Sequence, residues 1–248
     1  MSHDSSPDQI EALALAEPAP LAVAAALLDV VCRRLAPGGG EWLEGAADEI
    51  RAPLRQEAFA TVYAVAARRV GKAPLALDAA DVAHLACAGV AWVPAHWGTD
   101  ELARAVLLLR AAAALAEPAF ASLVEECYAR GDNRERQAVL RSLGLLPAPV
   151  RFVALAVDAC RTSIQPVFEA IACENPYPAA YFPELHFNQM VLKALFVGVA
   201  LRRVVGLEGR ITAELRRMGA DYASERRAAG RPVPPDIDDL LHQRGRPS

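Results

Sequence analysis

Apolar and polar positions recur along the chain with the period of an α-helix, about 3.6 residues. The first clear pattern predicts a helix from Pro20 to Leu35, ended by Pro37 and the three glycines that follow it. Segments marked by proline or glycine separate the later patterns, which predict helices over 42–70 with a bend at Pro53, 78–92, 99–116, 118–130 and 132–143.

The second half of the chain continues in the same way. Residues 149–172 predict one amphipathic helix, kinked at Pro166 because proline cannot donate the helical hydrogen bond. Residues 184–205 are apolar almost all round, which predicts a central helix. A charged helix over 212–229 and a short turn of helix over 236–243 follow.

Composition agrees with this pattern, because Ala and Leu dominate while aromatic residues make up 6%. The predicted fold class is all-α, either an irregular helical bundle or a HEAT-like α-solenoid of about ten helices. The segment GDNRERQAVLRSLGLLP resembles one HEAT unit, but no motif recurs at a fixed period. Residues 1–17 are expected to be a frayed segment and residues 18–248 a single all-helical domain.

Charge and cysteine content exclude several classes of protein. Lys and Arg (26) nearly balance Asp and Glu (30), and no basic block suggests a nucleic-acid partner. No stretch of about 20 apolar residues is uninterrupted, so the chain is not predicted to span a membrane. The N-terminus lacks the features of a secretory signal, and the five cysteines do not suit a disulfide framework. A cytoplasmic location is therefore expected.

Local catalytic signatures are absent: there is no nucleophile elbow, phosphate-binding loop, dinucleotide fingerprint or paired C-x-x-C. Asp81, His84, Cys87 and His96 could in principle bind a metal, since the first three share one helical face. The same positions are predicted to face inward beside apolar residues, and ordinary core positions are the preferred interpretation. Neither a metal nor a cofactor is predicted.

Lys193 is a more informative residue, because it lies in the most apolar predicted helix. Asn188 and Gln189 lie about one turn before it. A buried ammonium group needs a partner, and the nearby acidic residues are Glu169, Glu174 and Glu184. Two alternatives remain open: a structural ion pair or a cavity lined for a ligand.

The charged helix near the C-terminus carries a second polar group. Asp221 and Glu225 share one helical face, and Tyr222 and Arg226 share another. This places an amphipathic phenol beside a guanidinium, which suits binding. An ordinary solvated helix face would show the same pattern.

The stretches RTSIQPVFEAIACENPYPAAYFPELHFNQMVLKALFVG and GLEGRITAELRRMGADYASERRAAGRPVPPDI resemble the EboA family, most strongly over residues 161–237. Members are encoded in the ebo gene cluster beside a membrane prenyltransferase of the UbiA type, a TatD-like hydrolase and barrel proteins. The resemblance implies a part in the traffic of secondary-metabolite precursors, and it implies no particular reaction.

The leading hypothesis is a non-catalytic helical protein that binds a small-molecule precursor or a partner protein of its cluster. Its binding residues are predicted in the second half of the chain: Arg161, Glu169, Asn175, Tyr177, Asn188, Gln189, Lys193, Asp221, Tyr222, Glu225 and Arg226. The alternative is an enzyme acting on an isoprenoid or aromatic precursor, with Lys193 or Tyr177 as acid or base and a carboxylate as partner. A purely structural scaffold is the third possibility.

Overall fold

The described residues of this protein, 19–92, 94 and 96–242 of a computed structural model, form fourteen α-helices, three short 3₁₀ helices and no strand. The predicted all-α class is therefore confirmed, and the solenoid alternative stays a prediction. The chain divides into two compact units, one of residues 15–155 and one that includes residues 156–248. The predicted frayed segment, residues 1–17, lies outside the described residues. No helix in the described ranges is long and apolar enough to cross a membrane.

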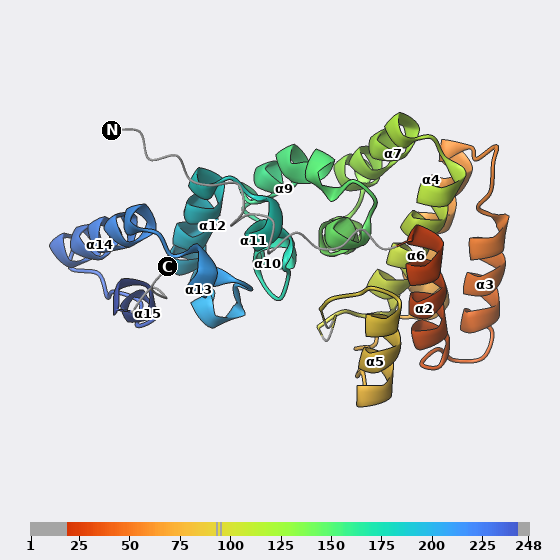
Figure 1. Ribbon diagram of the computed structural model, residues 1–248, viewed down its shortest axis with the longest axis horizontal. Coiled ribbons are helices and arrows are strands. Elements are labelled where there is room, and N and C mark those ends of the chain that lie inside the picture. Colours follow the sequence, from red (N-terminus) through yellow and green to blue (C-terminus); the bar gives the residue numbers. More distant parts are fainter. Residues whose placement is uncertain (1–18, 93, 95, 243–248) are drawn as a thin grey trace. The chain divides into compact units, whose positions relative to one another are not determined.

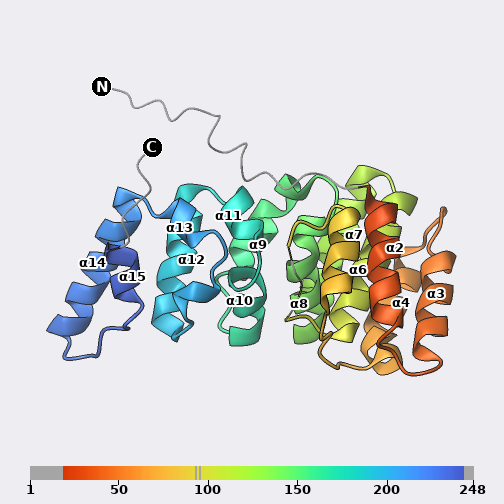
Figure 2. The ribbon, with the colours of Figure 1, turned by 60° about the horizontal axis from the view of Figure 1, so that its bottom comes forward.

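The N-terminal unit is built around α6 (Thr99–Ala114), which is buried over most of its length. Helices α2 (Pro20–Cys32), α4 (Gln56–Val70) and α8 (Asn133–Ser142) pack against it, as Figures 1 and 2 show. Residues such as Leu102 and Val106 have no exposed surface, and burying such side chains stabilises the unit by about 1.5–3 kcal/mol each. The predicted buried helix over 99–116 is thus the centre of this core.

Helices α3 (Gly39–Glu49), α5 (Ala79–Cys87) and α7 (Glu117–Arg130) complete the N-terminal unit. The single helix predicted over 42–70 is wrong. An extended loop around Pro53 separates α3 from α4, because proline restricts the residue before it and supplies no N–H for a helical turn. Asp132 begins α8 as expected, since its side chain accepts from the Glu135 N–H in a reciprocal capping box.

An acidic residue of α5 is held between two arginines of the α2 end. Asp81 is 2% exposed and accepts hydrogen bonds from Arg33 Nη2 at 2.6 Å and from the Arg34 guanidinium. Burial raises the pKa of its carboxyl, but the hydrogen bonds from Arg34 and Arg33 outweigh burial and hold that pKa well below its usual range. The charged form is therefore favoured in the folded state.

Replacing this carboxylate should have an effect that depends on pH. Because the folded pKa of Asp81 lies below the unfolded one, its contribution to stability is present above about pH 4 and is lost as the pH falls towards the folded value. We expect Asp81→Asn to lower the free energy of unfolding by about 2 kcal/mol at pH 7. Urea unfolding at pH 7 and pH 3 checks this, and an equal loss at both pH values would contradict it.

The C-terminal unit is centred on α12 (Glu184–Val197), which contacts α10 (Gln165–Ala172) and α14 (Ala213–Ala228). Its inward face carries Phe187, Val191 and Leu195, all buried. Around it lie the end of α9 (Val153–Ala159), α11 (Tyr177–Tyr181), α13 (Leu207–Arg210) and α15 (Ile237–His242), seen in green to blue in Figure 1. The three short 3₁₀ helices are Leu143–Leu145, Pro149–Phe152 and Leu201–Arg203.

Two predicted helix boundaries in this half are wrong for identifiable reasons. Residues 149–172 form a 3₁₀ turn and two helices. Pro166 lies in the first turn of α10, where an N–H group would have no helical hydrogen-bond partner, so its absence does not destabilise the helix. The helix predicted over 184–205 ends at Gly198, which has φ of 76° and forms a left-handed C-cap. Thr212 caps α14 as its position predicts, accepting from the Leu215 N–H.

Candidate functional site

A hollow of about 660 Å³ lies on the C-terminal unit, where α10, α12 and α14 meet. Its walls are largely apolar and aromatic, with Phe168 from α10, Leu192 and Phe196 from α12, and Tyr222 from α14. The polar lining comes from the turn before α10, the start of α10 and α12, and it consists of Arg161, Thr162, Ser163, Gln165 and Lys193. A hollow of this size, apolar with few polar groups, has the character of a small-molecule site.

Lys193 stands at the wall of this hollow, half-buried on α12. Its ammonium group donates to the carbonyl oxygens of Cys160 and Thr162, in the turn that follows α9, and lies 4.8 Å from the centre of the Phe168 ring. Carbonyls at the end of a helix lack helical partners and carry partial negative charge, which favours a cation there. Burial lowers the pKa of the Lys193 amine, although the neighbouring Cys160 opposes this.

Of the two alternatives for Lys193, the structural ion pair with a nearby carboxylate is wrong. Glu169 and Glu174 both accept from Arg203, at 2.7 Å each, while Glu184 accepts from the Thr212 hydroxyl at 2.6 Å. Arg203 binds both Glu169 and Glu174 because its planar guanidinium can donate to two carboxylates at once. The ammonium of Lys193 has three N–H groups, and among the described residues two have partners.

A smaller hollow of about 320 Å³ lies on another side of Lys193. Cys160, Arg161, His186 and Gln189 are among its lining residues. Burial raises the pKa of the Cys160 thiol to about 12, so this cysteine is protonated at neutral pH. Arg161 and Lys193 line both hollows, and Arg161 reaches outwards to Asp158 at 3.3 Å.

Three buried polar atoms of this unit have no hydrogen-bond partner within the described ranges: Tyr222 Oη, Asn188 Oδ1 and His186 Nδ1. An unsatisfied buried donor or acceptor costs about 1–3 kcal/mol, so such atoms call for an explanation. Tyr222 lines the larger hollow and His186 the smaller one. Asn188 is 1% exposed and lines neither.

The predicted residues Asn175 and Tyr177, which follow α10, make hydrogen bonds and packing contacts within the unit. Asn175 Nδ2 donates to the Ala170 carbonyl and its Oδ1 accepts from the Tyr177 N–H, both at 3.0 Å, so this side chain links the end of α10 to the start of α11. Tyr177 has no exposed surface and packs on Tyr181 and Phe182. Burial raises the pKa of its phenol further above its usual range.

This arrangement does not support the predicted pairing of Lys193 or Tyr177 with a catalytic carboxylate. Tyr177 lines neither hollow, and the ammonium of Lys193 is held by backbone carbonyls. Glu169, also predicted to bind, is bonded to Arg203 and to Gln165 Nε2 at 2.8 Å. The structure therefore places Glu169, Asn175 and Tyr177 in the framework of the unit.

The predicted binding residues of α14 lie in two different environments. Asp221 and Glu225 are exposed, and Asp221 pairs with Arg217 at 2.7 Å on the outer face. Arg226 donates from Nε to the Pro232 carbonyl at 2.7 Å, and its guanidinium carbon lies 5.8 Å from the centre of the Tyr222 ring. The solvated-face interpretation thus describes Asp221 and Glu225, and Tyr222 alone of this group lines the hollow.

The four metal-ligand candidates of the N-terminal unit have other surroundings. Asp81 is bonded to two arginines, and His84 Nε2 lies 3.3 Å from Asp29 Oδ2. The expectation that these residues all face inward is wrong, because α5 is short and buries only Asp81 and Leu85, leaving His84, Cys87 and His96 exposed. No group of three or more metal-ligating side chains occurs among the residues that the structure describes.

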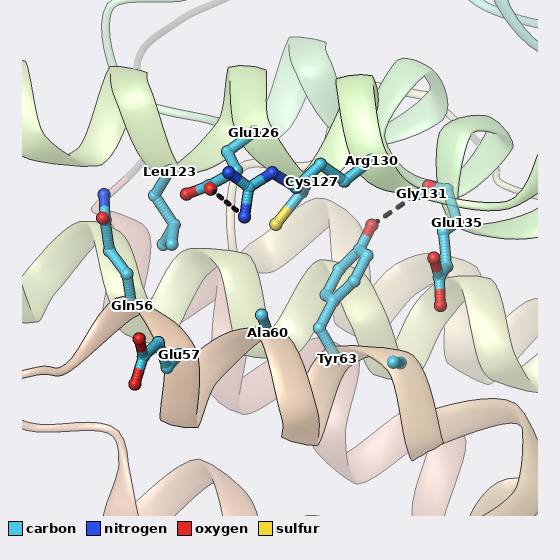
Figure 3. A pocket seen from close by; sticks show the side chains of 11 residues that line it. Gln56, Glu57, Ala60, Tyr63, Leu123, Glu126, Cys127, Arg130, Gly131 and Glu135 are labelled. Atoms are coloured by element: carbon cyan, nitrogen blue, oxygen red, sulfur yellow. Dashed lines mark hydrogen bonds and ion pairs between the residues drawn. The ribbon is translucent and has the colours of Figure 1, made fainter.

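A further hollow of about 580 Å³ lies in the N-terminal unit between α4 and α7. The apolar pattern did not predict it, and the small residues Ala60 and Ala64 are its only local signal. Figure 3 shows two interactions among the polar groups that line it: Tyr63 Oη donates to the Glu135 carbonyl at 3.1 Å, and Arg130 pairs with Glu126 at 2.8 Å. Burial raises the pKa of the Cys127 thiol to about 12. This hollow offers less for recognition than the one beside Lys193.

A comparison with known families matches most of the chain. The family described as metabolite traffic protein EboA matches residues 23–242. The chain belongs to the EboA family. The match covers both units, whereas the resemblance was clearest over residues 161–237, and the family description suggests metabolite traffic. No curated protein and no solved structure matches the chain.

Some residues that define the site were missed from the sequence. Thr162, Leu192 and Phe196 line the hollow, but the pattern treated the first as a solvated helix position and the other two as buried. Phe196 is 68% exposed. Phe196 follows Leu192 by four residues and Lys193 by three, which places all three on one side of α12. The sequence pattern did not show which elements neighbour that side.

Proposed function

We propose that this EboA-family protein binds and carries an amphiphilic small molecule in the hollow beside Lys193, without transforming it. The observation that carries the proposal is the combination of an apolar, aromatic wall with a lysine ammonium group that two backbone carbonyls hold in place. The molecule would have a flat or chain-like apolar body and one acceptor oxygen or anionic group. This deepens the metabolite traffic that the family description suggests.

The contacts of Lys193 support an acceptor group on the ligand. Two of its N–H groups are used by Cys160 and Thr162, which fix the nitrogen in place, and the third is available. Tyr222 lines the same hollow, and its buried hydroxyl, a second donor, has no partner within the described ranges. A ligand oxygen that accepted from both would relieve the cost of the unsatisfied hydroxyl.

A pair of fluorescent dyes with matched apolar bodies tests this. The anion 8-anilinonaphthalene-1-sulfonate carries an acceptor group, and N-phenyl-1-naphthylamine lacks it. We expect Lys193→Met to weaken binding of the anionic dye about tenfold or more, because a charge-assisted hydrogen bond contributes about 1.5–3 kcal/mol. Binding of the neutral dye should change little. Titrations followed by fluorescence give both dissociation constants.

The matched control is a substitution of Lys72, which is exposed and is the only other lysine of the chain. Lys72→Met should bind both dyes as the wild type does, while Phe196→Ser should weaken both because it removes part of the apolar wall. Circular dichroism melting curves verify that each variant is folded. If Lys193→Met and Lys72→Met bound the anionic dye equally well, the proposal would be overturned.

A partner protein from the gene cluster, such as the membrane prenyltransferase, is the second candidate. Leu185 and Phe196, both on α12, are 57% and 68% exposed, which is high for large apolar side chains. This candidate predicts capture of a purified companion protein that Leu185→Ser abolishes, together with no dye binding at the hollow. Dye binding that depends on Lys193 favours the small molecule instead.

A further inference from the structure

We infer that Lys193 can form a reversible imine with an apolar aldehyde or ketone bound in the hollow that α10, α12 and α14 line. The inference rests on the proposed function only in using the same hollow. It goes beyond that function because the ligand would be held by a covalent bond that hydrolysis can break. The ligand class is then narrowed to carbonyl compounds with an aromatic or chain-like body.

The surroundings of the nitrogen suit a nucleophile. Both hydrogens of a neutral Lys193 amine can remain bonded to the Cys160 and Thr162 carbonyls. Only the third proton of the ammonium must leave, and it has no partner among the described residues. The lone pair then lies on the side of the nitrogen away from both carbonyls. Holding the amine in one orientation also lowers the entropic cost of attack.

Carboxylates, which would keep the ammonium charged, are engaged elsewhere. Glu169 and Glu174 are bonded to Arg203, and no ion pair joins Lys193 to a carboxylate within the described ranges. Burial lowers the pKa of the amine, which raises its neutral fraction at a given pH. The aromatic wall, including Phe168 and Phe196, provides an apolar surface for the body of a carbonyl ligand.

The reaction is balanced without an oxidant or a cofactor. The nitrogen lone pair attacks the carbonyl carbon, the C–N bond forms, and the carbonyl oxygen becomes the hydroxyl of a carbinolamine. That hydroxyl then leaves as water, and the two hydrogens of the amine depart with it overall, leaving C=N. Tyr222 lines the same hollow, and its hydroxyl can pass a proton to the leaving oxygen and recover one from the nitrogen. Hydrolysis releases the ligand by the reverse steps.

Reductive trapping tests the inference directly. The full-length protein is incubated with 2-naphthaldehyde and sodium cyanoborohydride at neutral pH, digested, and the adducts at Lys193 and Lys72 are measured by mass spectrometry. We expect several-fold more adduct at Lys193 than at Lys72, because the aromatic wall binds the naphthalene ring beside the Lys193 amine and burial lowers the pKa of that amine. Because Lys72 is the only other lysine in the chain, it serves as an internal reference.

Variants and a non-carbonyl analogue separate this inference from the proposed function. Lys193→Arg should abolish the trapped adduct at that position, and Lys72→Arg should leave the Lys193 adduct unchanged. Tyr222→Phe should slow trapping of 2-naphthaldehyde. Lys72→Arg should also spare the affinity for 2-naphthalenemethanol, which cannot form an imine. Equal labelling of Lys72 and Lys193 overturns the inference. If 2-naphthalenemethanol and the dyes still bind in that case, the proposed function stands; if nothing binds, both fail.

Discussion

Asp100→Ala is expected to lower the free energy of unfolding by about 3–5 kcal/mol, because it removes the centre of a buried ion network. Asp100 has no exposed surface and accepts from Arg104 Nη1 at 2.8 Å and from Arg134 Nε at 3.1 Å. Arg104 is itself 1% exposed, so the substitution leaves a buried guanidinium without its nearest carboxylate. Its remaining neighbours are the Tyr63 carbonyl and, at 3.8 Å, Glu135.

Urea unfolding, followed by circular dichroism, measures this effect. Asp48→Ala is the matched control, because Asp48 also faces an arginine, Arg110, at 3.4 Å but its side chain is 77% exposed. We expect Asp48→Ala to lower the free energy of unfolding by less than about 1 kcal/mol, as is usual for exposed ion pairs. A similar loss in both variants would show that the buried position of Asp100 does not determine its contribution.

The helical pattern could be predicted because periodicity and capping residues are local. Asp132 and Thr212 begin helices where their side chains suggest, and α6 is buried as its apolar run predicts. Errors occurred at proline: Pro53 lies in a break between helices, and Pro166 lies at a helix start. Proline permits a kink, a break or a first turn, and the packing around it decides among them.

The candidate site was predicted in part. Lys193 and Gln189 line hollows with Arg161 and Tyr222, although these residues come from separate segments of the C-terminal unit. The partners of Lys193 could not be foreseen, because the two carbonyls belong to a turn that the pattern treated as continuous helix. Two of the three acidic residues considered as its partners, Glu169 and Glu174, are bonded instead to Arg203, a residue that no local signal marked.

Burial also could not be predicted for residues with two plausible roles. Asn175 and Tyr177 have polar groups typical of binding sites, yet their side chains connect α10 and α11 inside the unit. The apolar pattern of α12 predicted a helix buried on all sides, but Leu185 and Phe196 are exposed. Which side of a helix is covered depends on elements distant in sequence, and one chain without related sequences does not reveal them.

Tyr177→Ala is the second substitution expected to have a large effect. The ring has no exposed surface, and its centre lies 4.9 Å from that of Tyr181 and 6.3 Å from that of Phe182, in an edge arrangement with the latter. Removing a buried aromatic side chain leaves a cavity and typically costs about 3–5 kcal/mol. We expect the free energy of unfolding to fall by that amount in urea titrations. Leu185→Ala, at a position 57% exposed, is the control and should change little.

A second variant at the same position distinguishes a structural tyrosine from a catalytic acid or base. Tyr177→Phe keeps the ring and its packing, and because Tyr177 lines neither hollow beside Lys193, it should bind the anionic dye with unchanged affinity. Trapping of 2-naphthaldehyde at Lys193 should also proceed at the wild-type rate, since Tyr222 is the phenol placed at that hollow. If Tyr177→Phe were as stable as the wild type but slowed trapping more than Tyr222→Phe does, the assignment of these two tyrosines would have to be reversed.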